Sequence, residues 1–222
     1  IKSVNELACI KEGFRIIELA TDEVIRNLKP GVTELEMVGV AQRVIYENGA
    51  EYEGLPMYVF SEESTRHAIS RSSYRTIKKG DIVQLNLSAK IDGYSPSIGL
   101  PVIMGKLGGK RRELVEFCKK AHDWTCEKIK AGVVASDIAK AFYNLYLENG
   151  YAKNYVYGPC HGTGMIEVEA PWMETTSDYR LKENMTFQVD TFISGDTFGC
   201  RWEKGIVVKK DGYDSYTDYL KK

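Results

Sequence analysis

Lys29-Pro-Gly-Val-Thr-Glu-Leu-Glu36 is the stretch that decides the fold, because its opening recurs later in the chain. Lys29-Pro-Gly-Val32 returns as Lys130-Ala-Gly-Val133, and Glu47-Asn-Gly49 returns as Glu148-Asn-Gly150. Both pairs have the same offset of 101 residues (130 − 29 and 148 − 47). Matching segments at a fixed offset indicate an internal repeat. We therefore expect a chain built from two similar halves.

Segments of helical periodicity flank each copy of the repeated motif. The segment after the first copy opens with a capping box, Thr33-x-x-Glu36, and the one after the second copy opens at Ser136. Each ends in an Asn-Gly pair, which suits a left-handed helix stop. A longer amphipathic segment precedes each copy, over residues 3–28 and 111–129. Each half therefore begins with two predicted helices.

A β-rich stretch follows the helices of each half. Asp81-Ile-Val-Gln-Leu-Asn-Leu87 and Met185-Thr-Phe-Gln-Val-Asp-Thr191 match in pattern, and both lead into a glycine turn. Tight turns join these strands in place of crossover helices, which indicates an α+β architecture. Two copies are too few for a solenoid, so they predict two halves related by a pseudo-twofold axis. Helices would cover the outer face of the sheets, and ligands would bind the inner face.

The chain has no Pro/Ser-rich linker, so we expect one domain over 1–222 with halves of about 1–108 and 109–222. The net charge of −1 gives no general attraction to nucleic acid or an anionic membrane. Five cysteines without a CxxC pair predict free thiols, and a cytoplasmic location is the default expectation. The chain begins inside a helix entry, so a longer protein with a further N-terminal domain stays an open alternative.

Three histidines occur, and one has the context of a functional site. His161 lies in Gly158-Pro-Cys-His-Gly-Thr-Gly164, where closely spaced glycines allow the backbone to approach a ligand. His122 lies inside the 111–129 helix and is expected on its surface. Asp190 and Glu203 interrupt apolar strands, where a carboxylate is costly unless it is paired or bound to a metal. With His161 they form a candidate constellation.

These segments resemble the motifs of the pita-bread family, which includes creatinase, prolidase, aminopeptidase P and methionine aminopeptidase. His161–Trp172 is similar to HGIGLxxHExP, Leu181–Asp190 to LxPGMVFTIEP, and Gly199–Glu203 to GxRxED. In the first half, Lys79–Leu87 resembles KGDxVxxDxG, and Asp92-Gly-Tyr94 resembles the start of DGYxSDxTRT. The resemblance covers nearly the whole chain. It implies the pita-bread fold, an α+β domain with a curved antiparallel-rich sheet covered by helices.

The family's peptidases hold two metals, and the resemblance shows that this chain has lost part of that ligand set. At the matching positions the two aspartates are Asn86 and Ser97, the histidine is His161, the first glutamate is Asp190 and the last is Glu203. Two dications about 3.5–4 Å apart need anionic bridging ligands, which an amide and a hydroxyl do not supply. We therefore expect no metal cofactor. One divalent metal on His161, Asp190 and Glu203 is the alternative.

The resemblance gives His67 a role, because the family keeps a substrate-facing histidine at this position. Creatinase is a metal-free member, and its counterpart of this histidine moves protons. By that similarity His67 is the general acid/base, and His161 positions substrate or water as a second catalytic residue. The substrate-binding residues implied are Asp190, Glu203, Glu169 and Asn86.

The leading hypothesis is a creatinase-like, metal-independent hydrolase or lyase that acts on a C–N bond of a small nitrogenous compound. One alternative is a non-catalytic pita-bread domain that binds a peptide or protein. Another is an Xaa-Pro aminopeptidase or prolidase with a degenerate or single-metal site. The expected partners are a small-molecule or peptide substrate and a second copy in a homodimer, and neither nucleic acid nor a membrane.

Overall fold

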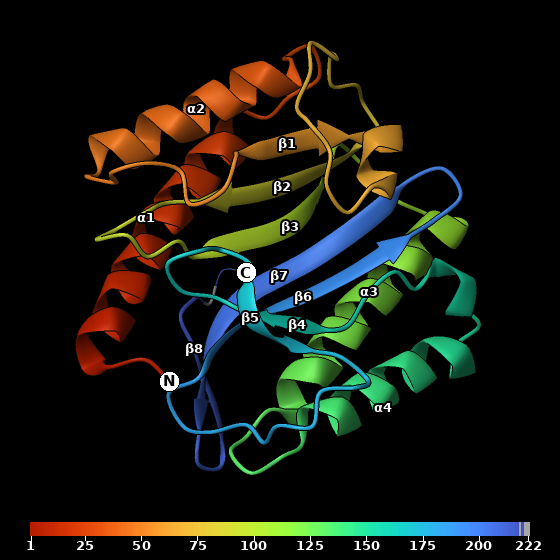
Figure 1. The fold of residues 1–222 in the computed structure, drawn as a ribbon. Coiled ribbons are helices and arrows are strands. Elements are labelled where there is room, and N and C mark those ends of the chain that lie inside the picture. The colour runs from red at the N-terminus through yellow and green to blue at the C-terminus, as the bar shows by residue number, and fades with distance from the viewer. Residues whose placement is uncertain (218, 220–222) are drawn as a thin grey trace.

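The computed structural model describes residues 1–217 and 219, and its helices pack on one eight-stranded sheet (Figure 1). The first half contains α1 (Val4–Asn27), α2 (Glu34–Glu47), β1 (Tyr58–Ser61), the short 3₁₀ helix η1 (Glu62–Arg66), β2 (Ile82–Ser88) and β3 (Ser97–Ile103). The second half contains α3 (Gly109–Lys128), α4 (Ala135–Glu148), η2 (Ala152–Asn154), β4 (Cys160–Gly162), β5 (Glu169–Met173), β6 (Thr186–Ser194), β7 (Gly199–Lys209) and β8 (Gly212–Ser215).

The strands run in the order β1-β2-β3-β7-β6-β4-β5, with β8 paired to β7, and every pairing is antiparallel. The two halves meet where β3 pairs with β7, at Gly99 opposite Glu203. In Figure 1, α1 and α2 lie beside the first-half strands, and α3 and α4 lie beside the second-half strands. This confirms the predicted α+β class.

The internal repeat is visible in the backbone itself. The Gly31 N–H donates to the Ile77 carbonyl at 2.9 Å, and the Gly132 N–H donates to the Leu181 carbonyl at 2.8 Å. Both glycines have positive φ, +104° and +88°, which a residue with a side chain adopts only with strain. The recurring Gly-Val motif therefore makes the same turn twice, joining each first helix to its second.

The helix starts differ between the halves in how their free N–H groups are satisfied. Helices α1 and α2 begin with complete capping boxes at Ser3 and Thr33. Helix α4 begins at Ala135, one residue before the predicted Ser136, and has no side-chain cap. Its first two N–H groups donate to the carbonyls of Tyr179 and Ser177, so the neighbouring loop replaces the cap.

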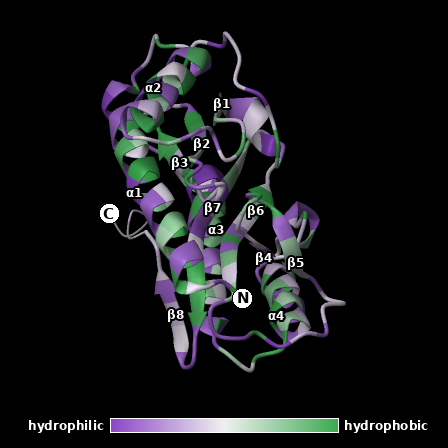
Figure 2. Cartoon of the chain, turned by 60° about the vertical axis from the view of Figure 1, so that its left-hand side comes forward, coloured by the Kyte–Doolittle hydropathy of each residue, from purple (hydrophilic) through white to green (hydrophobic). Residues whose placement is uncertain are grey.

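The core lies between the helices and the sheet. Figure 2 shows hydrophobic residues along the central strands and alternating hydropathy along the helices. The Phe14 ring of α1 is fully buried, stacks on Tyr216 at 5.7 Å and covers Gly205 of β7. A Cβ at Gly205 would lie 2.2 Å from the Phe14 ring, so the close packing of α1 requires this glycine. Within the described residues, none of the helices is long and apolar enough to cross a membrane.

His122 is buried, and the expected helix-surface position is wrong. It lies on the stripe of α3 that faces the sheet, together with Cys118, Ala121 and Thr125, because positions three and four residues apart share a helix face. Its Nε2 atom has no hydrogen-bond partner among the described residues. Burial lowers the pKa of His122, the contact of its Nδ1 with Asp123 Oδ1 at 3.5 Å partly opposes this, and Lys204 on β7 adds to the lowering.

We predict that His122 makes the fold acid-sensitive. The lowered pKa means that the folded state protonates this imidazole at a lower pH than the unfolded chain, which takes up a proton near pH 6.5. The His122 contribution is therefore full above that pH and is lost as the pH falls below it, at up to about 1.4 kcal/mol per pH unit. Urea unfolding between pH 7 and pH 5 should show a steeper loss of stability for the wild type than for His122→Leu. The exposed His67→Ala variant is the control and should keep the wild-type slope.

Candidate functional site

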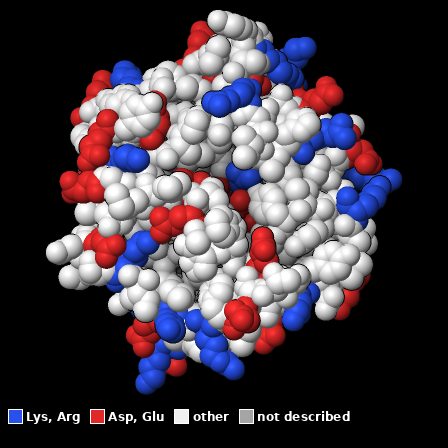
Figure 3. Space-filling view, viewed as in Figure 1, with Lys and Arg blue, Asp and Glu red and all other residues white. Residues whose placement is uncertain are grey.

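A cavity of about 590 Å³ opens on the sheet, and none of its lining residues comes from the four α-helices. Figure 3 shows acidic side chains in and beside a hollow near the centre of this face. The walls are mainly apolar and include Leu55, Pro56, Tyr58, Ile69, Ile166, Val168, Trp172 and Met173. The polar and charged lining residues are Tyr157, His161, Glu167, Glu174, Asp190, Arg201 and Glu203.

The strand register brings the charged groups of the floor together. Asp190 on β6 lies directly opposite Glu203 on β7, and Arg201 is two residues before Glu203, on the same face of the strand. His161 on β4 lies beside β6, opposite Gln188. The alternation of side chains along β-strands therefore points these groups into one cavity.

Gly99 allows Asn86 of the first half to contact Glu203 of the second half. Asn86 on β2 lies opposite Gly99 on β3, and Gly99 lies opposite Glu203. Across this glycine the Asn86 amide Nδ2 donates to Glu203 Oε2 at 2.7 Å. A Cβ at Gly99 would lie 2.8 Å from both Asn86 Nδ2 and Glu203 Cβ. A side chain at position 99 would therefore disturb this link between the halves.

Asp190 is neutralised by its own neighbours. Its Oδ1 lies 3.0 Å from Arg201 Nε in an ion pair, and its Oδ2 accepts from the Tyr157 hydroxyl at 2.8 Å. Arg201 Nη2 also donates to the Tyr157 hydroxyl and to the Ala68 carbonyl, both at 2.8 Å. Burial alone would lower the pKa of Arg201, but Asp190, Tyr157 and Glu203 outweigh burial and raise it. The guanidinium therefore stays charged and holds Asp190.

Glu167 and Glu203 form a buried carboxyl pair. Ser97 Oγ lies 2.7 Å from Oε1 of each, and one hydroxyl proton serves only one of these contacts at a time. Burial raises the pKa of Glu203 well above its ordinary value, and repulsion from Glu167 and Asp190 raises it further. Burial also raises the pKa of Glu167. The pair is therefore stabilised by a bound positive charge, supplied by a proton or by a cation.

The Nε2 atom of His161 faces the carboxylates of Glu167 and Asp190. Its Nδ1 lies 3.0 Å from the Gly162 carbonyl, which only accepts, so Nδ1 carries the proton in the neutral ring. Its Nε2 is 3.9 Å from Glu167 Oε1 and 4.0 Å from Asp190 Oδ2. The free Nε2 lone pair can therefore accept a proton or bind a metal.

The geometry fits one metal ion and does not fit two. His161, Glu167 and Glu203 each offer one ligand atom, and these atoms lie within 4.8 Å of one another. At the positions expected to supply two further ligands, Asn86 and Ser97 point hydrogen-bond donors at the carboxylates. Asp190, the third ligand predicted for a single metal, also lies 4.0 Å from His161 Nε2 but is paired with Arg201, and Glu167 takes its place in the ligand set.

The remaining predicted residues lie outside this cluster. His67 ends η1 with an exposed side chain and does not line the cavity, although its neighbours Ala68 and Ile69 do. Glu169 Oε1 forms an ion pair with Lys2 Nζ at 2.7 Å, and Glu169 does not line the cavity. The roles predicted for His67 and Glu169 stay predictions.

Sequence reasoning missed Glu167 as a site residue. It lies in the irregular segment between β4 and β5, where no periodicity fixes the direction of a side chain. An acidic residue six positions after His161 (167 − 161), in a glycine-containing segment, was the available signal. The burial of Glu167, which is 5% exposed, separates it from the more accessible Glu169.

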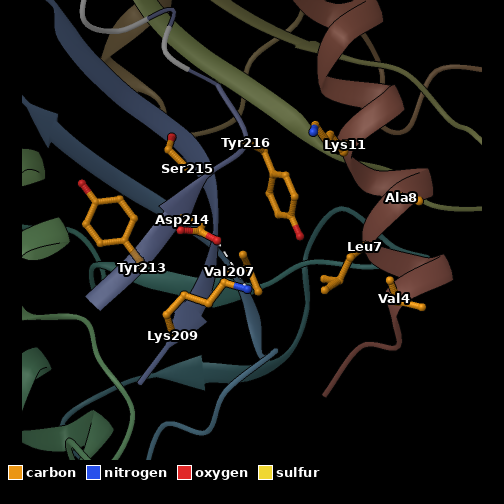
Figure 4. Close-up of a pocket in the computed structure, with 10 residues that line it drawn as sticks. All are labelled: Val4, Leu7, Ala8, Lys11, Val207, Lys209, Tyr213, Asp214, Ser215 and Tyr216. Carbon is orange, nitrogen blue, oxygen red and sulfur yellow. Dashed lines mark ion pairs between the residues drawn. The ribbon is translucent and has the colours of Figure 1, made fainter. Parts of the chain in front are cut away.

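A second cavity, of about 690 Å³, lies between α1 and the β7–β8 hairpin (Figure 4). Its lining includes Leu7, Lys11 and Tyr216, and its one acidic residue, Asp214, is paired with Lys209 at 3.4 Å. The lining lacks histidine and any second carboxylate. The chemistry-bearing residues therefore converge in the first cavity.

The fold and this cavity place the chain in a known class. A model of metallopeptidase family M24 matches residues 8–210, and the chain belongs to this family. It is 25% identical over 213 residues to an Xaa-Pro dipeptidase from Pyrococcus horikoshii, covering 96% of this chain and 61% of the relative. These residues are therefore a family M24 domain, as the motifs predicted.

Solved structures agree with the family. An X-Pro aminopeptidase from Thermotoga maritima superposes with a TM-score of 0.93 at 25% identity, over 98% of this chain and 61% of that one. An Xaa-Pro dipeptidase from Bacillus anthracis gives 0.94 at 26%, over 98% and 62%. This confirms the predicted pita-bread fold. The chain spans about 61% of the length of its relatives, and the predicted homodimer and cytoplasmic location stay predictions.

We predict that removing the Arg201 cation destabilises the fold. Arg201→Met leaves Asp190 buried without its counter-charge, and breaking a buried ion pair costs about 3–5 kcal/mol. Urea unfolding at pH 7 measures the loss. Arg43→Met is the control: Arg43 is 51% exposed and its partners Glu23 and Glu47 are 31% and 57% exposed, so a loss of about 0–1 kcal/mol is expected. Equal losses for the two variants would contradict the role of Arg201.

Proposed function

We propose that this domain hydrolyses the peptide bond of a short peptide at a site that holds one divalent cation. The observation that carries the proposal is the cluster of His161, Glu167 and Glu203, whose ligand atoms lie within 4.8 Å of one another and face a cavity large enough for a short peptide. Membership of a metallopeptidase family and similarity to Xaa-Pro dipeptidases support it. Three ligands and an open position are typical of a catalytic metal site.

Charge balance supports a single cation. Glu167 and Glu203 together carry two negative charges when ionised, and Asp190 is already balanced by Arg201. One dication neutralises the pair, whereas a second would leave an uncompensated charge in a buried site. When bound, such a cation polarises a carbonyl oxygen and lowers the pKa of a bound water.

The side chains of the domain have separate tasks in this proposal. The carboxyl pair, Glu167 and Glu203, holds the cation together with His161, and burial, which raises the pKa of both carboxyls, favours their pairing with a positive charge. Ser97 and Asn86 fix the orientation of Glu203 by hydrogen bonds. The apolar walls, including Tyr58 and Trp172, receive the substrate side chains and exclude water.

One observation favours a second candidate, a creatinase-like, metal-independent reaction at a C–N bond. Glu167 and Glu203 share the Ser97 hydroxyl and Asn86 donates to Glu203, so a proton held by the two carboxyls lowers their charge without a cation. In this candidate His67 is the general acid/base and reaches the substrate from the rim, beside Ala68 and Ile69 of the cavity wall. The two candidates differ in whether they need a cation.

We predict that the domain binds one Mn²⁺ per chain, because oxygen and imidazole ligands suit this ion. Isothermal titration calorimetry should give a stoichiometry near one. Glu167→Gln should weaken binding roughly 10–100-fold, since it removes a charged ligand atom. The matched control is Glu169→Gln, the same change two residues away and outside the cavity, and its Mn²⁺ affinity should be that of the wild type.

Two results would contradict this proposal, one a binding stoichiometry and the other an activity. Two Mn²⁺ per chain would contradict the single-cation site. A protein that hydrolyses leucyl-proline after exhaustive chelation would contradict the cation requirement and favour the second candidate.

We predict for the second candidate that turnover of amino-acid amides survives chelator and depends on His67. General acid–base catalysis contributes about 10²–10⁴-fold, so His67→Ala should lower kcat by that order. Steady-state assays with and without EDTA measure both effects. Unchanged kcat in His67→Ala, or full loss of activity with EDTA, would remove this candidate.

A further inference from the structure

The cavity carries a charge pattern that bears on which peptides it accepts. Four carboxylates line it, Glu167, Glu174, Asp190 and Glu203, against one cationic side chain, Arg201. With all four ionised its formal charge is −3 (−4 + 1), a proton on the Glu167–Glu203 pair leaves −2 (−3 + 1), and a bound dication leaves −1 (−3 + 2). In each of these states the described lining attracts a cationic group and repels the carboxylate of a ligand.

All three guanidinium nitrogens of Arg201 face groups of the protein itself. Its Nε pairs with Asp190 at 3.0 Å, its Nη1 lies 3.9 Å from Glu203 Oε2, and its Nη2 donates to the Tyr157 hydroxyl and the Ala68 carbonyl at 2.8 Å. Its side chain is 9% exposed. A free dipeptide would therefore bring its C-terminal carboxylate into a cavity whose one lining cation is already engaged.

The outer part of the cavity has the chemistry of a site for a cation or an uncharged apolar chain. Trp172 lies on the wall with 48% of its surface exposed, two residues before Glu174, and Ile166 and Val168 are also half-exposed or more. Glu174 is exposed, and its N–H is held by the Ser177 hydroxyl at 3.0 Å. An indole beside a carboxylate favours an ammonium group or an apolar side chain.

We propose that the cavity selects peptides that have a free amine, apolar side chains and no charge at the carboxyl side, such as longer or C-terminally amidated peptides, over free dipeptides. The proposal rests on the proposed peptide-binding function and names its substrate class. It separates this chain from the dipeptidases that it resembles, because those names imply a substrate with a free carboxylate close to the scissile bond.

Three probes test the charge pattern by binding alone, measured by calorimetry on the Mn²⁺-loaded and the chelator-treated protein. Leucyl-leucinamide should bind at least about tenfold more tightly than leucyl-leucine, which adds one carboxylate. It should also bind more tightly than N-acetyl-leucyl-leucinamide, which lacks the cationic amine. The preferences should weaken as salt is raised, because they are electrostatic.

Glu174→Lys supplies the missing cation at an exposed position, where the fold is not at risk. It should raise the affinity for leucyl-leucine and lower that for leucyl-leucinamide, each by about fivefold to tenfold. Glu183→Lys makes the same charge change in the turn before β6, away from the cavity, and should keep the wild-type preference.

The outcomes distinguish a failure of the proposed selectivity from a failure of the proposed function. If leucyl-leucine binds as tightly as its amide, or Glu174→Lys changes neither affinity, the selectivity is overturned while peptide binding stands. If none of the three probes binds to either form of the protein, the proposed function falls and the selectivity falls with it.

Discussion

Glu203 lies where β7 meets β3, and its carboxylate is held from both halves of the chain. Asn86 and Ser97 of the first half donate to its oxygens, while Glu167 of the second half shares the Ser97 hydroxyl with it. The backbone contact beneath is the single pairing of Gly99 with Glu203. Because a buried carboxylate must be hydrogen-bonded and charge-compensated, this one residue links the joining of the halves to the chemistry of the site.

The site is asymmetric because the two halves carry different residues at positions that the pseudo-twofold axis relates. Asn86 and Asp190 occupy equivalent strand positions, as do Gly99 and Glu203, since both pairs are 104 residues apart (190 − 86 and 203 − 99). One half supplies a glycine and an amide where the other supplies two carboxylates. The small glycine makes room, the amide donates a hydrogen bond, and the charged pair sits in the space so formed.

Two different charge balances operate in the same cavity. Asp190 is balanced permanently by Arg201, whose other contacts hold the guanidinium in place. Glu203 lies 3.9 Å from Arg201 Nη1 and Glu167 lies 3.9 Å from His161 Nε2, both longer than the Arg201–Asp190 contact, so this pair also takes a proton or a cation. A fixed ion pair therefore lies beside a carboxyl pair whose charge is balanced by a proton or a cation.

The sequence by itself determined the repeat, the helices and the matched strands, because glycine turns, capping boxes and apolar periodicity act through local physics. It also predicted that His161, Asp190 and Glu203 lie together, His161 from its closely spaced glycines and the two carboxylates because charged groups inside apolar strands stand out, and all three line one cavity. Only the tertiary structure decided that Glu167 joins them and that Glu169 pairs with Lys2, because side chains in an irregular segment have no period to fix their direction. It likewise decided that His122 is buried and that Arg201 engages Asp190, since both depend on what packs across the sheet.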